Sequence, residues 1–186
     1  MKAHTLLHNP IVAALLVVFL AAGPIKAQSA RLDELFDQLQ TDDDQAAERT
    51  QQDIWNEWSK SGSPAMDLLL QRGRQAIDDG YPEVAIEHLT ALVDHAPDFA
   101  EGWNARATAY YETGDFGPAI SDIGHVLTLN PRHFGALSGL GAIFEDLGRP
   151  EQALEVYKAA LAINPHAPGV KEAVDRIEAD LQGQDL

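Results

Sequence analysis

The stretch Phe134–Ala167 reads FGALSGLGAIFEDLGRPEQALEVYKAALAINPHA and decides the fold. Apolar residues recur at helical spacing on both sides of Gly148, which predicts two helices joined by a short turn. Glycine readily adopts the left-handed conformation that ends a helix, and Pro150 suits the first turn of the helix that follows. Pro165 then ends the second helix. The stretch therefore predicts a helical hairpin.

The same pattern occurs twice more upstream, with a period of 34 residues. Three columns share this period: the glycines of the turns, the prolines that close the hairpins, and alanines in the second helices. They are Gly80, Gly114 and Gly148; Pro97, Pro131 and Pro165; and Ala85, Ala119 and Ala153. Self-similarity at such a period is typical of helical solenoids. We predict stacked hairpins over residues 66–99, 100–133 and 134–167.

Small residues mark the places where the two helices of a hairpin approach closely. We expect the small residues of the first helices to face the alanines of the second helices, and the larger apolar and aromatic residues around them to form the core. The facing pairs are Gly73 with Ala85, Ala107 with Ala119, and Gly141 with Ala153. The periodic aromatic residues are therefore interpreted as packing groups, and no cofactor is expected.

The repeat unit resembles the tetratricopeptide repeat (TPR) over residues 66–167. The second unit carries the resemblance at Trp103, Ala107, Tyr110, Gly114, Ala119 and Pro131, and the third unit at Leu137, Leu140, Gly141, Phe144, Gly148, Ala153, Tyr157, Ala160 and Pro165. The resemblance implies an all-α, right-handed solenoid of antiparallel helix pairs. Arg72 and Arg106 stand where the pattern prefers Leu, and Ala76 where it prefers an aromatic residue. These departures predict a looser first unit.

In proteins of this family the first helices line a concave groove that binds a peptide or helix of another protein. The corresponding inward positions are Asp67, Leu70 and Arg74 in the first unit, Glu101, Asn104 and Thr108 in the second, and Gly135, Ser138 and Ala142 in the third, with Tyr111 and Glu145 one turn further on. Some family members clamp a C-terminal carboxylate there with several basic residues. Arg74 is the single base among these positions, so the resemblance favours a basic or polar partner segment.

Both ends of the stack need a cover for their apolar faces. Residues 168–182 have apolar residues at helical spacing and predict a capping helix within the C-terminal region 168–186. Upstream, residues 31–39 and 45–59 predict a helix pair within the region 28–65, which we interpret as a degenerate fourth repeat. Its Trp55 and Trp58 are expected to be buried, with exposed anchors for a partner as the alternative.

Residues 1–27 predict an export signal. Lys2 precedes an apolar run over residues 11–22, and cleavage is expected after Ala27. The alternative is an uncleaved anchor, although a membrane span needs about 20 apolar residues. Cleavage would remove two lysines and change the net charge from -16 to -18. We expect a soluble chain in a bacterial periplasm, and no lipid anchor because the chain has no cysteine.

The composition excludes several functions. A net charge of -16 opposes binding to nucleic acid, because phosphate contacts depend on Lys and Arg. No nucleotide loop, zinc motif or nucleophile motif is present, so no enzyme, metal site or small-molecule substrate is expected. His133 and His166 are predicted to be exposed in turns, and the acids of residues 42–44 are assigned to a helix start rather than to a calcium site.

The sequence therefore predicts a non-enzymatic scaffold of the cell envelope that binds another protein or peptide. An accessory subunit for an enzyme of envelope peptidoglycan or polysaccharide is the alternative.

Overall fold

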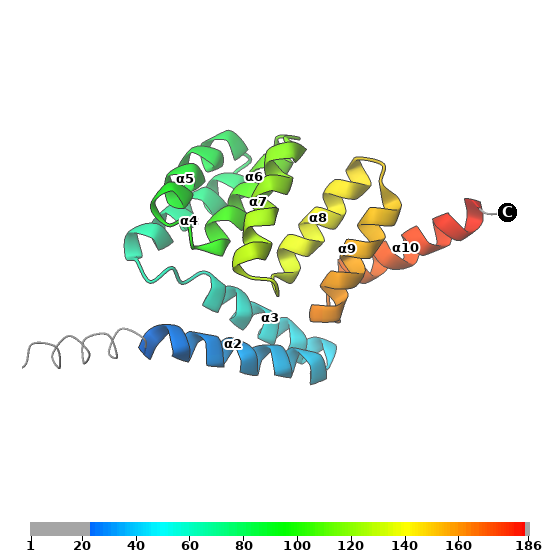
Figure 1. The fold of residues 1–186 in the computed structure, drawn as a ribbon, viewed down its shortest axis with the longest axis horizontal. Coiled ribbons are helices and arrows are strands. Elements are labelled where there is room, and N and C mark those ends of the chain that lie inside the picture. Colours follow the sequence, from blue (N-terminus) through cyan, green and yellow to red (C-terminus); the bar gives the residue numbers. More distant parts are fainter. Residues whose placement is uncertain (1–22, 185–186) are drawn as a thin grey trace, which may run out of the picture.

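The structure, a computed structural model, describes residues 23–184, and every regular element in this range is an α-helix (Figure 1). The helices are α2 (Gly23–Thr41), α3 (Asp44–Trp58), α4 (Pro64–Asp78), α5 (Pro82–His95), α6 (Ala100–Glu112), α7 (Phe116–Leu129), α8 (Phe134–Asp146), α9 (Pro150–Ile163) and α10 (Pro168–Gln184). The predicted all-α repeat fold is confirmed. No helix between Gly23 and Gln184 combines the length and hydropathy needed to cross a bilayer.

Glycine and proline set the turns of the three repeats, as the period predicts. Gly80, Gly114 and Gly148 have φ angles of 79°, 77° and 67°, in the left-handed region. After α4, the amide of Tyr81 donates to the carbonyl of Ala76, which is the hydrogen bond that closes a helix end of this type. Each turn thus reverses the chain within a few residues, and the first and second helices of a repeat pack antiparallel.

Two small residues of the first helices, Gly73 and Gly141, lie against large side chains of the second helices rather than against the predicted alanines. A Cβ added to Gly73 would lie under 3.0 Å from side-chain atoms of Leu89, and one added to Gly141 would lie equally close to the ring of Tyr157. The predicted partners Ala85 and Ala153 are buried one turn away. The glycines are therefore needed to admit large side chains from the second helix.

Replacing Gly141 with leucine should destabilise the third repeat. The new side chain would occupy the space of the Tyr157 ring, and overpacking of this kind costs about 1–3 kcal/mol. Thermal unfolding followed by circular dichroism measures the loss. An unchanged melting temperature would contradict the observed register of α8 on α9.

The C-terminal helix covers the last repeat. Ala173, Val174 and Ile177 of α10 are buried in one cluster with Ala153 and Tyr157 of α9. An ion pair of 2.5 Å between Lys158 and Glu178 also joins α9 to α10. The apolar face that the third repeat would expose is thus buried, as expected for a capping helix.

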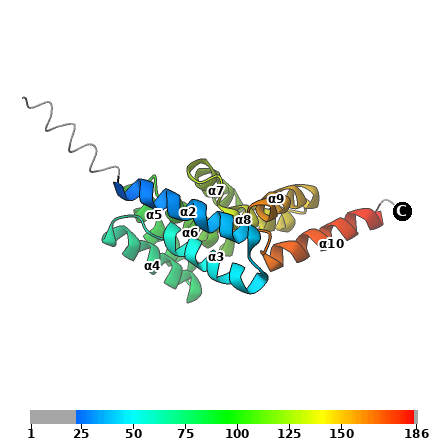
Figure 2. The same ribbon diagram turned by 90° about the horizontal axis from the view of Figure 1, so that it is seen from below.

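The N-terminal helix pair forms, but it does not extend the stack as a fourth repeat. It runs along the edge where the turns between repeats lie, below α7, α8 and α9 in Figure 1, and Figure 2 shows this edge directly. Its apolar residues Leu35, Leu39 and Ile54 join one cluster with Phe134 of α8, and Ile163 of α9 packs against that cluster. The interpretation as a stacked fourth repeat is wrong, because the apolar cluster of the helix pair lies at the edge of the third repeat and not at the end of the stack.

An aspartate begins α3, as predicted for the acids of residues 42–44. Asp43 caps α3, since its carboxylate accepts a hydrogen bond of 2.8 Å from the amide of Ala46. Asp115 precedes α7 without capping it through its side chain, and accepts a hydrogen bond from Thr113 instead.

Residues 1–22 of the predicted signal lie outside the described residues, and α2 runs through the predicted cleavage point after Ala27.

Candidate functional site

The first helices α4, α6 and α8 line three adjoining hollows. A hollow of about 280 Å³ lies between α4 and α6, one of about 120 Å³ lies between α6 and α8, and one of about 370 Å³ lies beside α8 and the start of α10. Asn104 and Thr108 line both the first and the second hollow, and Gly135 lines both the second and the third. Together they form one trough, here called the groove.

The charged residues predicted for the first part of the groove are occupied within the chain. Asp67 accepts hydrogen bonds of 2.9 Å and 2.5 Å from the amide and hydroxyl of Ser61. Arg74 donates to the hydroxyl of Ser59 at 2.9 Å and also pairs with Glu101. These contacts hold the linker between α3 and α4, so Arg74 is not a free base that would clamp a carboxylate.

Three predicted groove residues line none of the three hollows: Asp67, Leu70 and Glu145. Leu70 is fully buried in the core cluster of the first repeat, with Leu89 and Leu92 as neighbours. The positions inherited from the family thus overestimate how far the groove extends along α4.

Glu101 belongs to a buried network around His133. The exposed fraction is 2% for Glu101 and 0% for His133, and the two side chains meet at 2.9 Å. The other ring nitrogen of His133, Nδ1, accepts a hydrogen bond from the amide of Ala136 and so caps α8. Because Nδ1 accepts, Nε2 carries the proton and donates to Glu101. The prediction that His133 is exposed is wrong.

Sequence reasoning missed His133 as part of the site, although a signal was present. His133 immediately precedes α8, at a position where a side-chain acceptor caps a helix. The ring also stacks on Trp58 of α3, with centroids 4.2 Å apart and planes at 16°. His133 thus connects the N-terminal hairpin, the second repeat and the third repeat.

The hollow between α6 and α8 is open and is called the slot below. Its rim carries the predicted groove residues Asn104, Thr108 and Tyr111 of α6 and Ala142 of α8. Its walls are apolar and small, and a Cβ added to Gly139 would have no described heavy atom within 4 Å. A volume of about 120 Å³ approaches the 150 Å³ of a cavity that binds benzene, so the slot suits one apolar side chain.

Polar groups on the rim of the slot have capacity for a peptide. Asn104 donates one hydrogen bond to Glu101 at 3.2 Å, and Thr108 donates its hydroxyl proton to the carbonyl of Asn104. The amide oxygen of Asn104 and the hydroxyl oxygen of Thr108 are acceptors. Ser138, which lines the neighbouring hollow, donates to the carbonyl of Phe134 in the same way.

Glu145 is engaged at the far end of the predicted groove. It accepts hydrogen bonds of 2.8 Å from the hydroxyl of Tyr157 and 2.6 Å from Arg176 of α10. Burial, followed by the hydrogen bond to Glu145, raises the pKa of the Tyr157 phenol above its usual value. A hydrogen bond to Asp146 likewise raises the pKa of Tyr111. Glu145 therefore holds the capping helix in place and is not free for a partner.

Trp55 of α3 lines the groove, which the sequence did not predict. Its side chain borders the first and the third hollow, and a Cβ on Gly135 would lie under 3.0 Å from its ring. Trp58 is 8% exposed. Trp58 is thus buried as expected, whereas Trp55 is half-buried, packed on Gly135 and Phe134 and bordering the groove.

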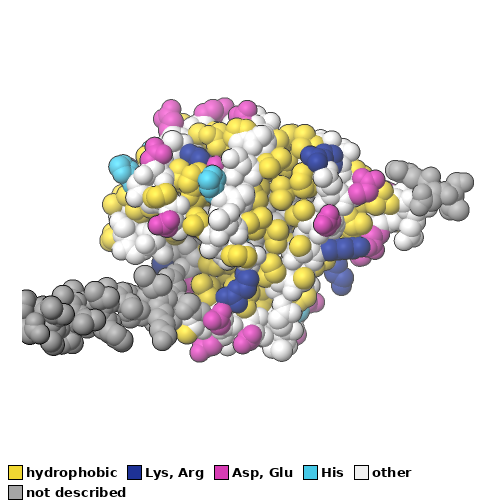
Figure 3. Space-filling view, in the orientation of Figure 1, with side chains coloured by type: hydrophobic (Ala, Val, Ile, Leu, Met, Phe, Trp, Pro, Cys, Tyr) yellow, Lys and Arg dark blue, Asp and Glu magenta, His cyan; other side chains and the backbone are white. Residues whose placement is uncertain are grey.

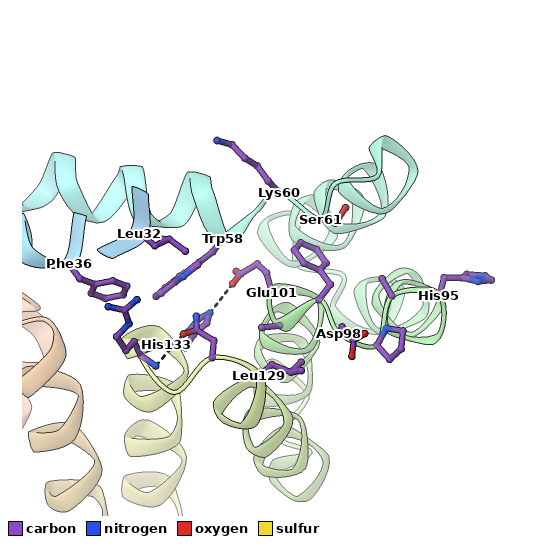
Figure 4. A pocket seen from close by; sticks show the side chains of 16 residues that line it. Leu32, Phe36, Trp58, Lys60, Ser61, His95, Asp98, Glu101, Leu129 and His133 are labelled. Carbon is purple, nitrogen blue, oxygen red and sulfur yellow. Dashed lines mark hydrogen bonds and ion pairs between the residues drawn. The ribbon is translucent and has the colours of Figure 1, made fainter. Parts of the chain in front are cut away.

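A cavity of about 560 Å³, the largest of those described, lies between the N-terminal helix pair α2–α3 and the turns that follow α5 and α7. Figure 4 shows Leu32, Phe36 and Trp58 on its hairpin side and Leu129 on the opposite side, with the contact between Glu101 and His133 in between. Within residues 23–184 no three His, Asp or Glu side chains gather as metal ligands. Figure 3 shows a further feature, a band of hydrophobic side chains over α7 and α8.

Comparison with known proteins gives consistent matches. The profile of the tetratricopeptide repeat matches residues 70–124 and 105–168. A TPR repeat-containing protein of Rhizobium etli is 38% identical over 154 residues, which cover 82% of this chain and 76% of that protein. The small glutamine-rich tetratricopeptide repeat-containing protein 2 of Saccharomyces cerevisiae is 29% identical over 117 residues, and the chain spans 34% of its length.

Solved structures share the arrangement of helices. The first TPR domain of Spaghetti (RPAP3), bound to the HSP90 peptide SRMEEVD, is 26% identical with a TM-score of 0.61, and the match covers 64% of this chain and 95% of that one. MamA is 21% identical with a TM-score of 0.60, over 80% of this chain and 85% of that one. The likeness to MamA shows the fold alone.

Proposed function

Because the chain belongs to the tetratricopeptide repeat family, we propose that it is a protein-interaction scaffold that binds a partner segment in its groove. The observation that carries the proposal is the slot between α6 and α8, which is open, apolar inside and polar at its rim. The related domain of Spaghetti is bound to a peptide in its solved structure. Binding rather than catalysis is the proposed activity.

The slot favours a particular kind of segment. One apolar side chain would enter between Gly139 and Ala107, while Asn104 and Thr108 accept hydrogen bonds from the amides of the segment. Asp78 lines the hollow next to α4, and Asp146 lies beside Tyr111, so acids flank the slot on two sides. A polar or basic segment with an apolar anchor is therefore the proposed ligand.

The proposed place of action is the bacterial cell envelope. Support comes from the sequence of residues 1–27, which has the basic start, apolar run and small residue at position 27 of an export signal. The relative in Rhizobium etli is also a bacterial protein.

Filling the slot should abolish partner capture without unfolding the chain. Gly139→Leu places a side chain where an added Cβ has no described atom within 4 Å, and leucine favours a helix more than glycine by about 1 kcal/mol. The measurement is capture of proteins from an envelope extract by the tagged chain, with mass spectrometry identifying what is bound.

Gly124→Leu is the matched control, because Gly124 lies on the exposed side of α7, does not line the slot, and is also open. A partner retained by the Gly124→Leu variant and lost from Gly139→Leu supports the proposal. Equal capture by both variants would place the partner elsewhere on the chain.

A further inference from the structure

We infer that the α2–α3 hairpin is an internal ligand of the groove, with Trp55 as its anchor at Gly135, and that it competes with any partner segment reaching this edge. The inference rests on the proposed function, because competition by the hairpin has an effect only if the groove binds a partner. Its test below uses no partner, so the two can fail separately.

The anchor fits a site that the stack provides. The ring of Trp55 lies against the Cα of Gly135, which occupies the groove position held by Asp67 and Glu101 in the other repeats. The indole also contacts Phe134 edge-on, with centroids 5.6 Å apart at 79°. Aromatic pairs of this geometry contribute about 0.5–1.5 kcal/mol beyond their buried area. Glycine at position 135 is therefore what admits the ring.

Trp55 separates two repeats. The hollows it borders lie on one side against Asn104 of α6 and on the other against Ser138 of α8. The ring thus lies between the second and third repeats, next to the slot, which Gly135 also lines.

Charge complementarity holds the hairpin to the stack. Asp33 of α2 pairs with Arg132 at 2.6 Å, and Asp44 of α3 meets His166 at 2.8 Å. Gln51 of α3 also accepts a hydrogen bond of 2.9 Å from Asn164. The ion pair of Asp33 with Arg132 is exposed, and such pairs are worth about 0–1 kcal/mol each. These polar contacts orient the hairpin, whereas its apolar cluster with Phe134 supplies most of the docking energy.

The hairpin is supported along one side. Its contacts gather at the turns around His133 and Asn164, whereas the cavity of about 560 Å³ separates it from the turn after α5. Gly62, with a φ of 82°, lies in the linker between α3 and α4 and permits a change of direction there. Undocking would expose Gly135 and Ser138 and lengthen the groove beyond the slot.

The test presents the hairpin to the groove from outside. A fluorescent peptide spanning residues 30–60 is titrated with three full-length chains: the natural one, the Trp55→Ala/Trp58→Ala variant, and that variant with Gly135→Ala added. Fluorescence anisotropy measures the binding, and circular dichroism verifies the helix content of each chain.

We expect the peptide to bind the double variant at least about tenfold more tightly than the natural chain, because a tethered competitor acts at an effective concentration near the millimolar range. Adding Gly135→Ala should abolish the gain. Equal binding to all three chains, or no binding to the double variant, would overturn the inference.

Hydrogen exchange supplies a second measurement in which both tryptophans remain. Gly135→Ala should accelerate exchange in α2 and α3 while α4, α5 and α9 keep their protection, since the new Cβ overlaps the Trp55 ring. Gly139→Ala is the matched control on the same helix, because its Cβ meets no described atom within 4 Å. Unchanged exchange of α3 in the Gly135→Ala variant would also refute the inference.

Discussion

Replacing His133 with alanine is expected to lower the free energy of unfolding by about 2–4 kcal/mol. The change removes the cap of α8, the donor to the buried carboxylate of Glu101 and the ring that stacks on Trp58. Losing a cap costs about 1 kcal/mol. Leaving the buried carboxylate of Glu101 with one hydrogen-bond donor fewer costs about 1–3 kcal/mol more. Urea unfolding followed by circular dichroism measures the difference.

His125 provides the control for this substitution. Its ring also stacks on a tryptophan, Trp103, with centroids 4.3 Å apart, but the side chain is exposed and caps no helix. Alanine at position 125 should cost less than about 1 kcal/mol. Equal losses for the two histidines would show that the network around His133 contributes nothing beyond the stacking of the ring.

Removing the carboxylate of Asp122 is expected to cost about 3 kcal/mol, because it leaves the guanidinium of Arg106 without its partner. Asp122 accepts two hydrogen bonds from Arg106, of 2.7 Å and 2.9 Å, and the two side chains are 5% and 12% exposed. The hydrogen bond to Asp122 raises the pKa of Arg106, so the arginine stays charged throughout the accessible pH range. Thermal unfolding of Asp122→Ala measures the loss.

The double substitution Arg106→Met/Asp122→Leu should recover most of that stability, since a buried ion pair can often be replaced by apolar residues of similar volume. Glu178→Ala is the exposed control: its pair with Lys158 is 40% and 53% exposed, and the loss should stay below about 1 kcal/mol. A double variant as unstable as Asp122→Ala would mean that the pair holds α6 and α7 in a way that packing cannot replace.

The same pair explains a departure from the family pattern. Arg106 stands where the repeat prefers Leu, one of the departures from which the sequence alone predicted a looser first unit. In the structure the guanidinium lies 4.9 Å from the ring of Trp103 as well as on Asp122. An aspartate on the second helix compensates for the arginine on the first, and this pairing is visible only when the two helices are placed together.

The groove could be predicted in part. Asn104, Thr108, Tyr111 and Ala142 line the slot, because their positions on the first helices follow from the repeat register. Leu70 and Glu145 are not available to a partner. Leu70 is buried in the core of the first repeat, and Glu145 is paired with Arg176 of the capping helix. Register places a residue on a face of a helix, and contacts from elsewhere in the chain determine whether that face remains free.

The sequence by itself determined the helices, their turns and the repeated stack. Left-handed glycines, helix-starting prolines and apolar periodicity act within a few residues, so they act in the same way in each unit. Only the tertiary structure decided that the N-terminal hairpin turns back onto the third repeat, that His133 is buried, and that Trp55 enters the groove. Amphipathic patterning shows that a residue is buried but not against what, and these contacts join residues about 30 to 120 positions apart.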